Sequence, residues 1–167
     1  VPVVPLELSA YSKKENWGAS ETFYRLVRAV LIAAHPSPKT ERPARPAGQA
    51  PRVNLLGPTA LGFRCRDDVV EVARLLQALG VTVNVTAPAG ASVADLARLP
   101  EADANVCLYP EVALTTGKWL ERHFKQPLIQ TVPIGIGAIN DFLREVGAAL
   151  GLTLDPAALP DDLHSRL

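Results

Sequence analysis

The loop between Gly57 and Arg66 carries the side chains best placed to do chemistry, because it follows a short apolar stretch and precedes a helical pattern. Two glycines and a proline prevent a continuous helix here, so the pattern predicts a strand that ends near Gly57, then a loop, then a helix. Ligands of open α/β sheets bind at the carboxyl ends of strands, where free backbone groups and a helix N-terminus meet. We therefore expect the functional site in this loop.

Two kinds of side chain in the loop suggest two kinds of contact. Arg64 and Arg66 can bind an anionic group. Alternatively, they pair with the neighbouring carboxylates Asp67, Asp68 and Glu71. The largely apolar stretch 59–63 invites an apolar ligand or a subunit contact. Its candidate contact residues are Thr59, Leu61 and Phe63.

Trp17 is a further candidate for a contact. It follows the polar run 11–16, which predicts a surface loop. Its indole either packs over the helix that follows or contacts a partner, since exposed tryptophans are enriched at binding hot spots.

Motifs of the common catalytic and cofactor sites are missing from the sequence. It contains no P-loop for ATP and no G-x-S-x-G nucleophile elbow. Gly135 and Gly137 follow a predicted strand, but Asn140 occupies the third glycine position of a dinucleotide fingerprint, so a structural turn is favoured. Cys65 and Cys107 lie apart from each other and from the histidines, so no metal-ligand spacing exists.

The composition narrows the class of protein. A chain of 167 residues is sufficient for one domain with one core. Its 17 basic and 17 acidic residues cancel, which disfavours nucleic acid as a partner. No apolar run is long enough to cross a bilayer, and no basic-then-apolar leader opens the sequence. With only two cysteines, the expected location is the cytoplasm.

The composition also divides the chain into four segments: an N-terminal strand and helix (1–34), a Pro/Arg-rich linker (35–51), a Rossmann-like βα domain (52–151) and a C-terminal tail (152–167). The run from Val1 to Leu8 alternates apolar residues with prolines, which favours an edge strand or a first strand. Ser20 can cap a helix that runs to Ala34. The linker buries too little apolar surface to offset its ordering entropy, so we expect it to be exposed and extended, with His35 in solvent.

Strand and helix patterns alternate through the third segment. The predicted strands are 53–56, 81–86, 104–109 and 128–132, and the predicted helices are 67–79, 92–99, 111–124 and 139–150. Gly80 and Gly151 are expected to end the first and last of these helices, Ser92 and Asp95 to form a capping box, and Pro110 to take a first helical position. Four successive βα units imply a parallel sheet with helices on both faces. The predicted fold class is α/β, a Rossmann-like three-layer α/β/α domain with a mainly parallel sheet.

Six runs of the sequence carry a resemblance to a known family. They are 5–8 (PLEL), 14–19 (KENWGA), 54–64 (NLLGPTALGFR), 87–92 (APAGAS), 109–111 (YPE) and 131–138 (TVPIGIGA). In this order they resemble the B subunits of the light-independent, or dark-operative, protochlorophyllide reductases, which are nitrogenase-like proteins. The resemblance extends over nearly the whole chain except the linker.

The resemblance implies an enzyme of chlorophyll or bacteriochlorophyll biosynthesis that reduces the C17–C18 double bond of protochlorophyllide to give chlorophyllide without light. In this family an ATP-hydrolysing iron protein, L, passes electrons from reduced ferredoxin to a complex of N and B subunits. That complex is expected to be an N2B2 heterotetramer with a [4Fe–4S] cluster, in the bacterial cytoplasm. In nitrogenase-like folds the loop equivalent to 57–66 faces the active-site cavity.

By the family pattern, this chain is an internal fragment. The family's cluster-binding aspartate belongs to a segment before Val1 and its proton-donating aspartate to one after Leu167, and neither Asp161 nor Asp162 matches the second motif. The resemblance therefore implies a fragment without catalytic residues or metal ligands that is inactive alone. The alternative is a stand-alone binding or subunit-interaction domain without catalysis.

Overall fold

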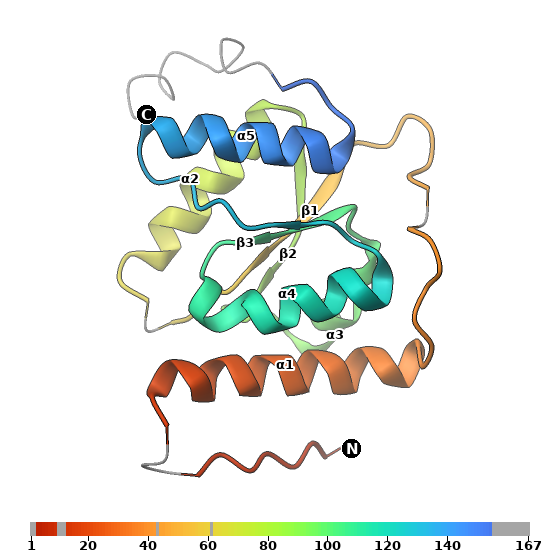
Figure 1. The fold of residues 1–167 in the computed structure, drawn as a ribbon, viewed down its shortest axis with the longest axis vertical. Coiled ribbons are helices and arrows are strands. Elements are labelled where there is room, and N and C mark those ends of the chain that lie inside the picture. Colours follow the sequence, from red (N-terminus) through yellow and green to blue (C-terminus); the bar gives the residue numbers. More distant parts are fainter. Residues whose placement is uncertain (1–2, 10–12, 43, 61, 155–167) are drawn as a thin grey trace.

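The computed structural model describes residues 3–9, 13–42, 44–60 and 62–154. Its centre is a four-stranded sheet with the order β2-β1-β3-β4 (Figure 1). The strands are β1 (Arg52–Leu56), β2 (Thr82–Ala87), β3 (Ala104–Cys107) and β4 (Leu128–Ile129). All three strand pairings are parallel, so the predicted parallel sheet is confirmed.

Helices cover both faces of the sheet, which gives the predicted three layers. The helices are α1 (Glu15–Ala34), α2 (Cys65–Ala78), α3 (Val93–Ala97), α4 (Pro110–Phe124) and α5 (Ile136–Leu150), with a 3-10 turn η1 (Leu99–Glu101). One apolar core joins α2 and α5 to one face, and a second joins α1, α3 and α4 to the other. In Figure 1, α1 lies beyond α4, on the side away from the sheet.

Strand β1 belongs to both cores because successive side chains of a strand point to opposite faces. Val53 and Leu55 are buried in the core with α2 and α5, whereas Leu56 is buried in the core with α1 and α4. Each such fully buried side chain contributes roughly 1.5–3 kcal/mol through removal of apolar surface from water. Burial on both faces explains why three of the five residues of β1 are apolar.

A row of amide side chains crosses the sheet inside the second core. Asn84 donates to Oδ1 of Asn54 (2.9 Å), Asn54 donates to Oδ1 of Asn105 (2.8 Å), and Asn105 donates to Oε1 of Gln126 (3.2 Å). Asn54 and Gln126 also donate to the carbonyl of Leu99, at 2.9 Å in both cases. Nothing in the sequence pattern predicted this row, which connects three strands to η1.

The predicted helix signals at four positions are confirmed. Gly80 follows α2 with φ +76°, and the Val81 amide donates to the Leu76 carbonyl at 2.9 Å, which closes the helix end. Ser92 and Asp95 form a complete capping box at α3. Pro110 is the first residue of α4, and Gly151 ends α5 in a left-handed conformation.

The N-terminal prediction is wrong in two respects. Residues 3–9 do not form a strand; they run beside α1 on the side away from the sheet, where no strand edge is available to pair with them (Figure 1). Helix α1 begins at Glu15 rather than after Ser20, with Lys14 as its N-cap residue. Glu15 in the first turn favours this early start, because its charge complements the helix dipole.

Several helices and strands begin or end at other residues than predicted. Helix α2 begins two residues before the expected Asp67, and α5 begins at Ile136 instead of Ile139. Strand β4 is much shorter than the predicted 128–132. The reason is a competing partner: the amides of Gln130 and Thr131 donate to the carboxylate of Glu145 at 3.0 Å instead of continuing the sheet.

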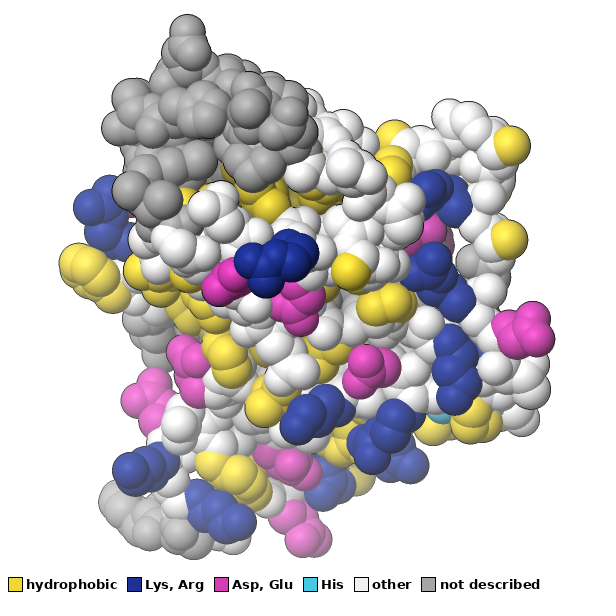
Figure 2. Space-filling model, turned by 45° about the horizontal axis from the view of Figure 1, so that its top comes forward, with side chains coloured by type: hydrophobic (Ala, Val, Ile, Leu, Met, Phe, Trp, Pro, Cys, Tyr) yellow, Lys and Arg dark blue, Asp and Glu magenta, His cyan; other side chains and the backbone are white. Residues whose placement is uncertain are grey.

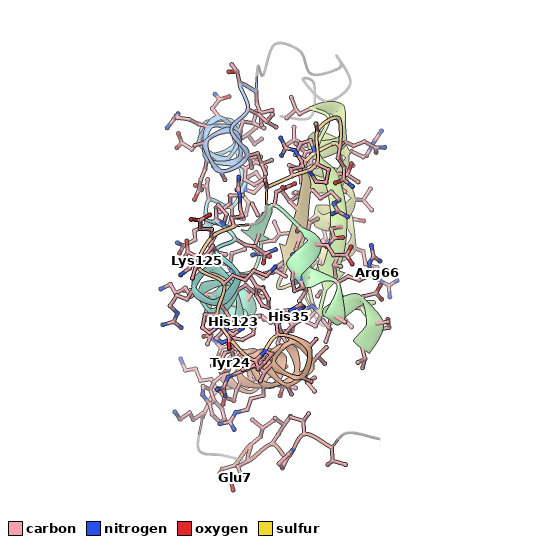
Figure 3. The ribbon with its side chains drawn as sticks, turned by 90° about the vertical axis from the view of Figure 1, so that its right-hand side faces the viewer. Glu7, Tyr24, His35, Arg66, His123 and Lys125 are labelled. Carbon is pink, nitrogen blue, oxygen red and sulfur yellow. The ribbon has the colours of Figure 1, made fainter. Side chains whose placement is uncertain are left out.

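The linker is fixed to the domain at several points, although its described residues form no helix or strand and are mostly exposed. The Lys39 amide donates to the His123 carbonyl at 2.8 Å, and the Arg42 guanidinium donates to the Ala149 carbonyl at 2.9 Å. The expectation that His35 is solvated is wrong. Its ring packs edge-on against Phe124, and its carbonyl lies 2.9 Å from Nε2 of His123 (Figure 3).

Candidate functional site

The carboxyl edge of the sheet is where the chain can build a site. From β1 the chain moves outward to β2 and then returns to β3 on the other side of β1. At such a switch point the two loops that follow β1 and β3 diverge, and ligands of open α/β sheets bind between them. The first turns of α2 and α4 begin at these two loops.

Gly57 permits the close approach of these two loops. Its φ is +111°, and a Cβ atom at this position would lie 2.7 Å from the carbonyl oxygen of Tyr109. Only glycine fits such a contact without displacement of the backbone. The glycine that follows β1 therefore also positions Tyr109 beside the loop 57–66.

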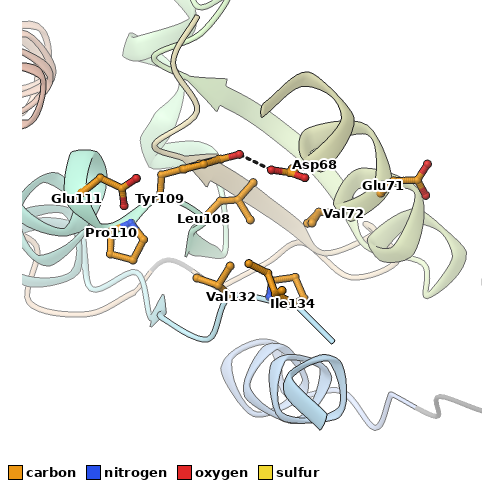
Figure 4. Close-up of a pocket in the computed structure, with 10 residues that line it drawn as sticks. Asp68, Glu71, Val72, Leu108, Tyr109, Pro110, Glu111, Val132 and Ile134 are labelled. Carbon is orange, nitrogen blue, oxygen red and sulfur yellow. Dashed lines mark hydrogen bonds between the residues drawn. The ribbon is translucent and has the colours of Figure 1, made fainter. Parts of the chain in front are cut away.

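A cavity of about 380 Å³ opens between α2, α4 and the loop after β4 (Figure 4). Its walls are largely apolar and its rim is acidic. The lining residues are Asp68, Glu71, Val72, Leu108, Tyr109, Pro110, Glu111, Val132, Pro133 and Ile134. This volume lies within the range typical of small-ligand pockets. We call it the Tyr109 pocket.

Tyr109 and Asp68 form the polar contact of this pocket. The Tyr109 hydroxyl donates to Oδ2 of Asp68 at 2.5 Å. Burial raises the pKa of Tyr109, and the hydrogen bond to Asp68 and the negative charges of Asp68 and Glu111 raise it further. Tyr109 therefore keeps its proton at physiological pH and acts as a donor.

Arg64 forms an ion pair, which is one of the two contacts that the sequence suggests for it. Its Nε donates to Oδ2 of Asp67 at 3.0 Å, and both side chains are largely exposed. Arg64 also adopts a left-handed conformation, with φ +53°, at the N-cap of α2. An exposed pair of this kind contributes little to stability.

Arg66 lines a second cavity, of about 400 Å³, together with loop residues that follow β1 and β2. No hydrogen bond or ion pair joins the side chain of Arg66 to another residue in the described part of the chain. Cys65 lines the same cavity, where its Sγ lies 2.8 Å from the Thr59 carbonyl. The predicted pairing of Arg66 with a nearby carboxylate is therefore not formed.

The apolar candidates are not gathered at one point. Phe63 is 89% exposed, and Thr59 lines a third cavity, of about 590 Å³, against the first half of α1. Leu61 lies outside the described residues. Trp17 is half-buried in the first turn of α1, not in a loop, and the Lys13 ammonium lies 4.9 Å from its ring centre.

The residues present do not fit an iron–sulfur cluster. Cys107 is buried in β3, and its burial, followed by the negative charge of Glu111, raises its pKa to about 11. The other thiol, Cys65, is buried and contacts a backbone carbonyl. No group of three or more potential metal ligands occurs in the ranges that the structure describes. Within the same ranges, no helix is long and apolar enough to cross a membrane.

Sequence reasoning missed the Tyr109 pocket. Tyr109 ends a predicted strand and Pro110 starts a predicted helix, so their place at the carboxyl edge was available from the pattern. The partner Asp68 was considered only for local pairing with Arg64 or Arg66. Its hydrogen bond joins residues 41 positions apart and depends on the strand order, which the pattern does not specify.

Comparison with known proteins adds independent observations. A family model described as nitrogenase component 1 type oxidoreductase matches residues 1–165. A curated protein of Rhodospirillum rubrum, named as the B subunit of a light-independent protochlorophyllide reductase, is 61% identical over 98% of this chain. Proteins of the same name from Halorhodospira halophila and Prochlorococcus marinus are 62% and 55% identical over the whole chain. The chain spans 30%, 31% and 32% of the lengths of these three relatives, respectively.

Proposed function

The chain belongs to the nitrogenase component 1 type oxidoreductases, and we propose that it is part of the B subunit of a light-independent protochlorophyllide reductase. The observation that carries this proposal is the identity of 55–62% to three relatives of that name, over 98–100% of the chain. The parallel sheet and the close approach of its two central loops agree with a domain that builds one wall of a larger site.

The proposed reaction is the reduction of the C17–C18 double bond of protochlorophyllide, which adds two electrons and two protons to give chlorophyllide. Electrons come from reduced ferredoxin through an iron protein that hydrolyses ATP. The proposed partners are an N subunit, in an N2B2 heterotetramer with a [4Fe–4S] cluster, and the transient iron protein, in the bacterial cytoplasm. This chain supplies no cluster ligand and is inactive alone.

The proposed role of this chain is to form part of the substrate cavity or of the seam with the partner subunit. Residues of the loop 57–66 line two cavities, and the Tyr109 pocket opens beside them at the end of β3. The contact residues proposed from the sequence are Thr59, Leu61, Phe63, Arg64 and Trp17. The support is strongest for Phe63, because an aromatic ring that is 89% exposed costs solvation free energy unless something covers it.

Dark reduction by the reconstituted enzyme tests this proposal. The full-length subunit that contains this chain is combined with an N subunit, the iron protein, ATP and reduced ferredoxin, and chlorophyllide is measured by its absorbance. We expect product in the dark only when all components and ATP are present. An assembled complex that forms no chlorophyllide would contradict the proposal and leave the stand-alone binding domain as the alternative.

A further inference from the structure

We propose that the Tyr109 pocket receives an arginine side chain of the partner subunit. This inference rests on the proposed function, since it assumes that the chain works within a complex of subunits. It assigns a specific contact to the carboxyl edge of the sheet. The proposed contact is between a cation on an apolar stem and a pocket that is apolar inside and acidic at its rim.

The apolar walls of the pocket can pack against the aliphatic part of an arginine side chain. Val72 from α2, Leu108 just after β3, and Val132 with Ile134 from the loop after β4 line the interior (Figure 4). The three methylene groups of arginine can pack on these residues while the charged end stays near the rim. A cavity of about 380 Å³ is large enough for one long side chain.

The acidic rim of the pocket complements the positive charge of an arginine side chain. Asp68 and Glu111 come from the first turns of α2 and α4, and no lysine, arginine or histidine is among the lining residues. Among the residues that the structure describes, neither carboxylate is in an ion pair. Glu71, the third acidic lining residue, lies 3.5 Å from Arg74, so the pocket charge depends mainly on Asp68 and Glu111.

Tyr109 favours arginine over the other ligands considered. A guanidinium group can lie on the face of a tyrosine ring and donate two parallel hydrogen bonds to one carboxylate, which an ammonium group cannot do. A carboxylate or phosphate would be repelled by Asp68 and Glu111. The Tyr109 hydroxyl already donates to Asp68, so it offers no proton to an anion without the loss of that bond.

Exposed apolar side chains on the same edge indicate that the occupant belongs to a protein. Ile134, which lines the pocket, is 79% exposed, and Phe63, in the loop after β1, is 89% exposed. Large apolar residues beside charged ones are typical of a protein interface, in which the apolar contact excludes water from the charged pair. A free small cation would leave both side chains in water.

The test compares a pocket variant with a control of equal charge. The pocket variant carries Asp68→Asn and Glu111→Gln. The control carries Glu121→Gln and Asp141→Asn, which remove one charge each from α4 and α5 outside the pocket. All four substituted residues are exposed, so we expect both double variants to fold. Their unfolding midpoints, compared with that of the wild type, verify this. The full-length subunit is used throughout.

The readout is the Kd for the partner subunit at 50 and 300 mM NaCl. We expect the pocket variant to bind at least about tenfold more weakly at low salt and to lose most of the salt dependence of the wild type, with the control unchanged. A pocket variant that binds as tightly as the wild type, or a control that loses as much affinity, would overturn the inference. Dark reduction of protochlorophyllide by the wild-type complex is measured separately. If the wild-type complex is active but the pocket variant binds the partner subunit normally, the arginine contact is refuted and the proposed function is not.

Discussion

Phe63 has the most exposed of the large apolar side chains in the described part of the chain. Because its ring is 89% exposed, we expect Phe63→Ala to change the free energy of unfolding by less than about 0.5 kcal/mol. In the reconstituted enzyme, the same change should weaken pigment binding or subunit association several-fold, since buried aromatic side chains dominate interface energies.

The control for Phe63 is Val70→Ala, which removes another exposed apolar side chain, from α2. Pigment titration and the Kd for the partner subunit are measured for both variants. Unchanged values for Phe63→Ala in both measurements would show that Phe63 contacts neither the pigment nor the partner.

Glu145 makes stability depend on pH. Burial alone would raise its pKa, but hydrogen bonds from the Thr131 side chain and from the amides of Gln130 and Thr131 lower it below the ordinary value. A group whose pKa is lowered by folding stabilises the native state above its unfolded pKa, and this contribution disappears as the pH falls through the folded pKa.

We therefore expect Glu145→Gln to reduce the free energy of unfolding at pH 7 by about 1 kcal/mol, as for a half-exposed charged hydrogen bond. The difference from the wild type should shrink as the pH falls below about 4.5, the ordinary pKa of a glutamate. Urea unfolding at several pH values measures both. A difference that stays constant down to pH 3 would contradict the assigned cause.

At the scale of elements, Gly57 holds the ends of β1 and β3 together. In Gly57→Ala the new methyl group would lie 2.7 Å from the Tyr109 carbonyl oxygen at a φ of +111°. We expect a loss of at least about 3 kcal/mol in the free energy of unfolding, from the combination of steric overlap and unfavourable backbone conformation.

The matched control for this substitution is Gly18→Ala within α1, where a Cβ atom meets nothing within 4 Å. There we expect a gain of up to about 1 kcal/mol, since alanine favours helix more than glycine does. Thermal unfolding of both variants gives the comparison. Equal effects of the two substitutions would mean that the contact between the loops is not important for stability.

The amide row gives a second prediction at this scale. Asn105 is fully buried, accepts from Asn54 and donates to Gln126. Asn105→Ala removes both bonds and leaves buried polar atoms without these partners, which should cost about 2–4 kcal/mol. Denaturant unfolding measures the loss. A cost below about 1 kcal/mol would indicate that water or other groups replace the missing amide.

The sequence predicted the elements that depend on local signals. Gly80, the Ser92–Asp95 capping box and Pro110 each act through backbone conformation or hydrogen bonds within a few residues, so their effects can be read without the fold. The wrong predictions concern competition between distant groups. The length of β4 depends on Glu145, and residues 3–9 lack a strand because no sheet edge adjoins them.

The candidate site, too, has features that follow from local signals and features that depend on distant groups. Periodicity placed the loop 57–66 and Tyr109 at the ends of strands, which is a local result. The contact of Tyr109 with Asp68 depends on the strand order β2-β1-β3-β4, and the clash that requires a glycine at position 57 depends on the packing of two loops. Residue types alone could therefore locate the site but not its polar contacts.

At the scale of the whole molecule, charge gives little long-range guidance to a partner. The chain has 17 basic and 17 acidic residues, and both kinds occur across the face in Figure 2. We therefore expect recognition of a partner to depend on local features such as the Tyr109 pocket and the exposed Phe63. This agrees with a domain whose neighbours are parts of one enzyme.

Pigments of dark-grown cells test the proposed function most directly. The gene that encodes this chain is deleted in its source organism, the cells are grown without light, and the extracted pigments are identified. We predict that protochlorophyllide accumulates, that pigments derived from chlorophyllide are lost, and that the intact gene restores them. Normal levels of these pigments in the deletion strain in darkness would contradict the proposed function.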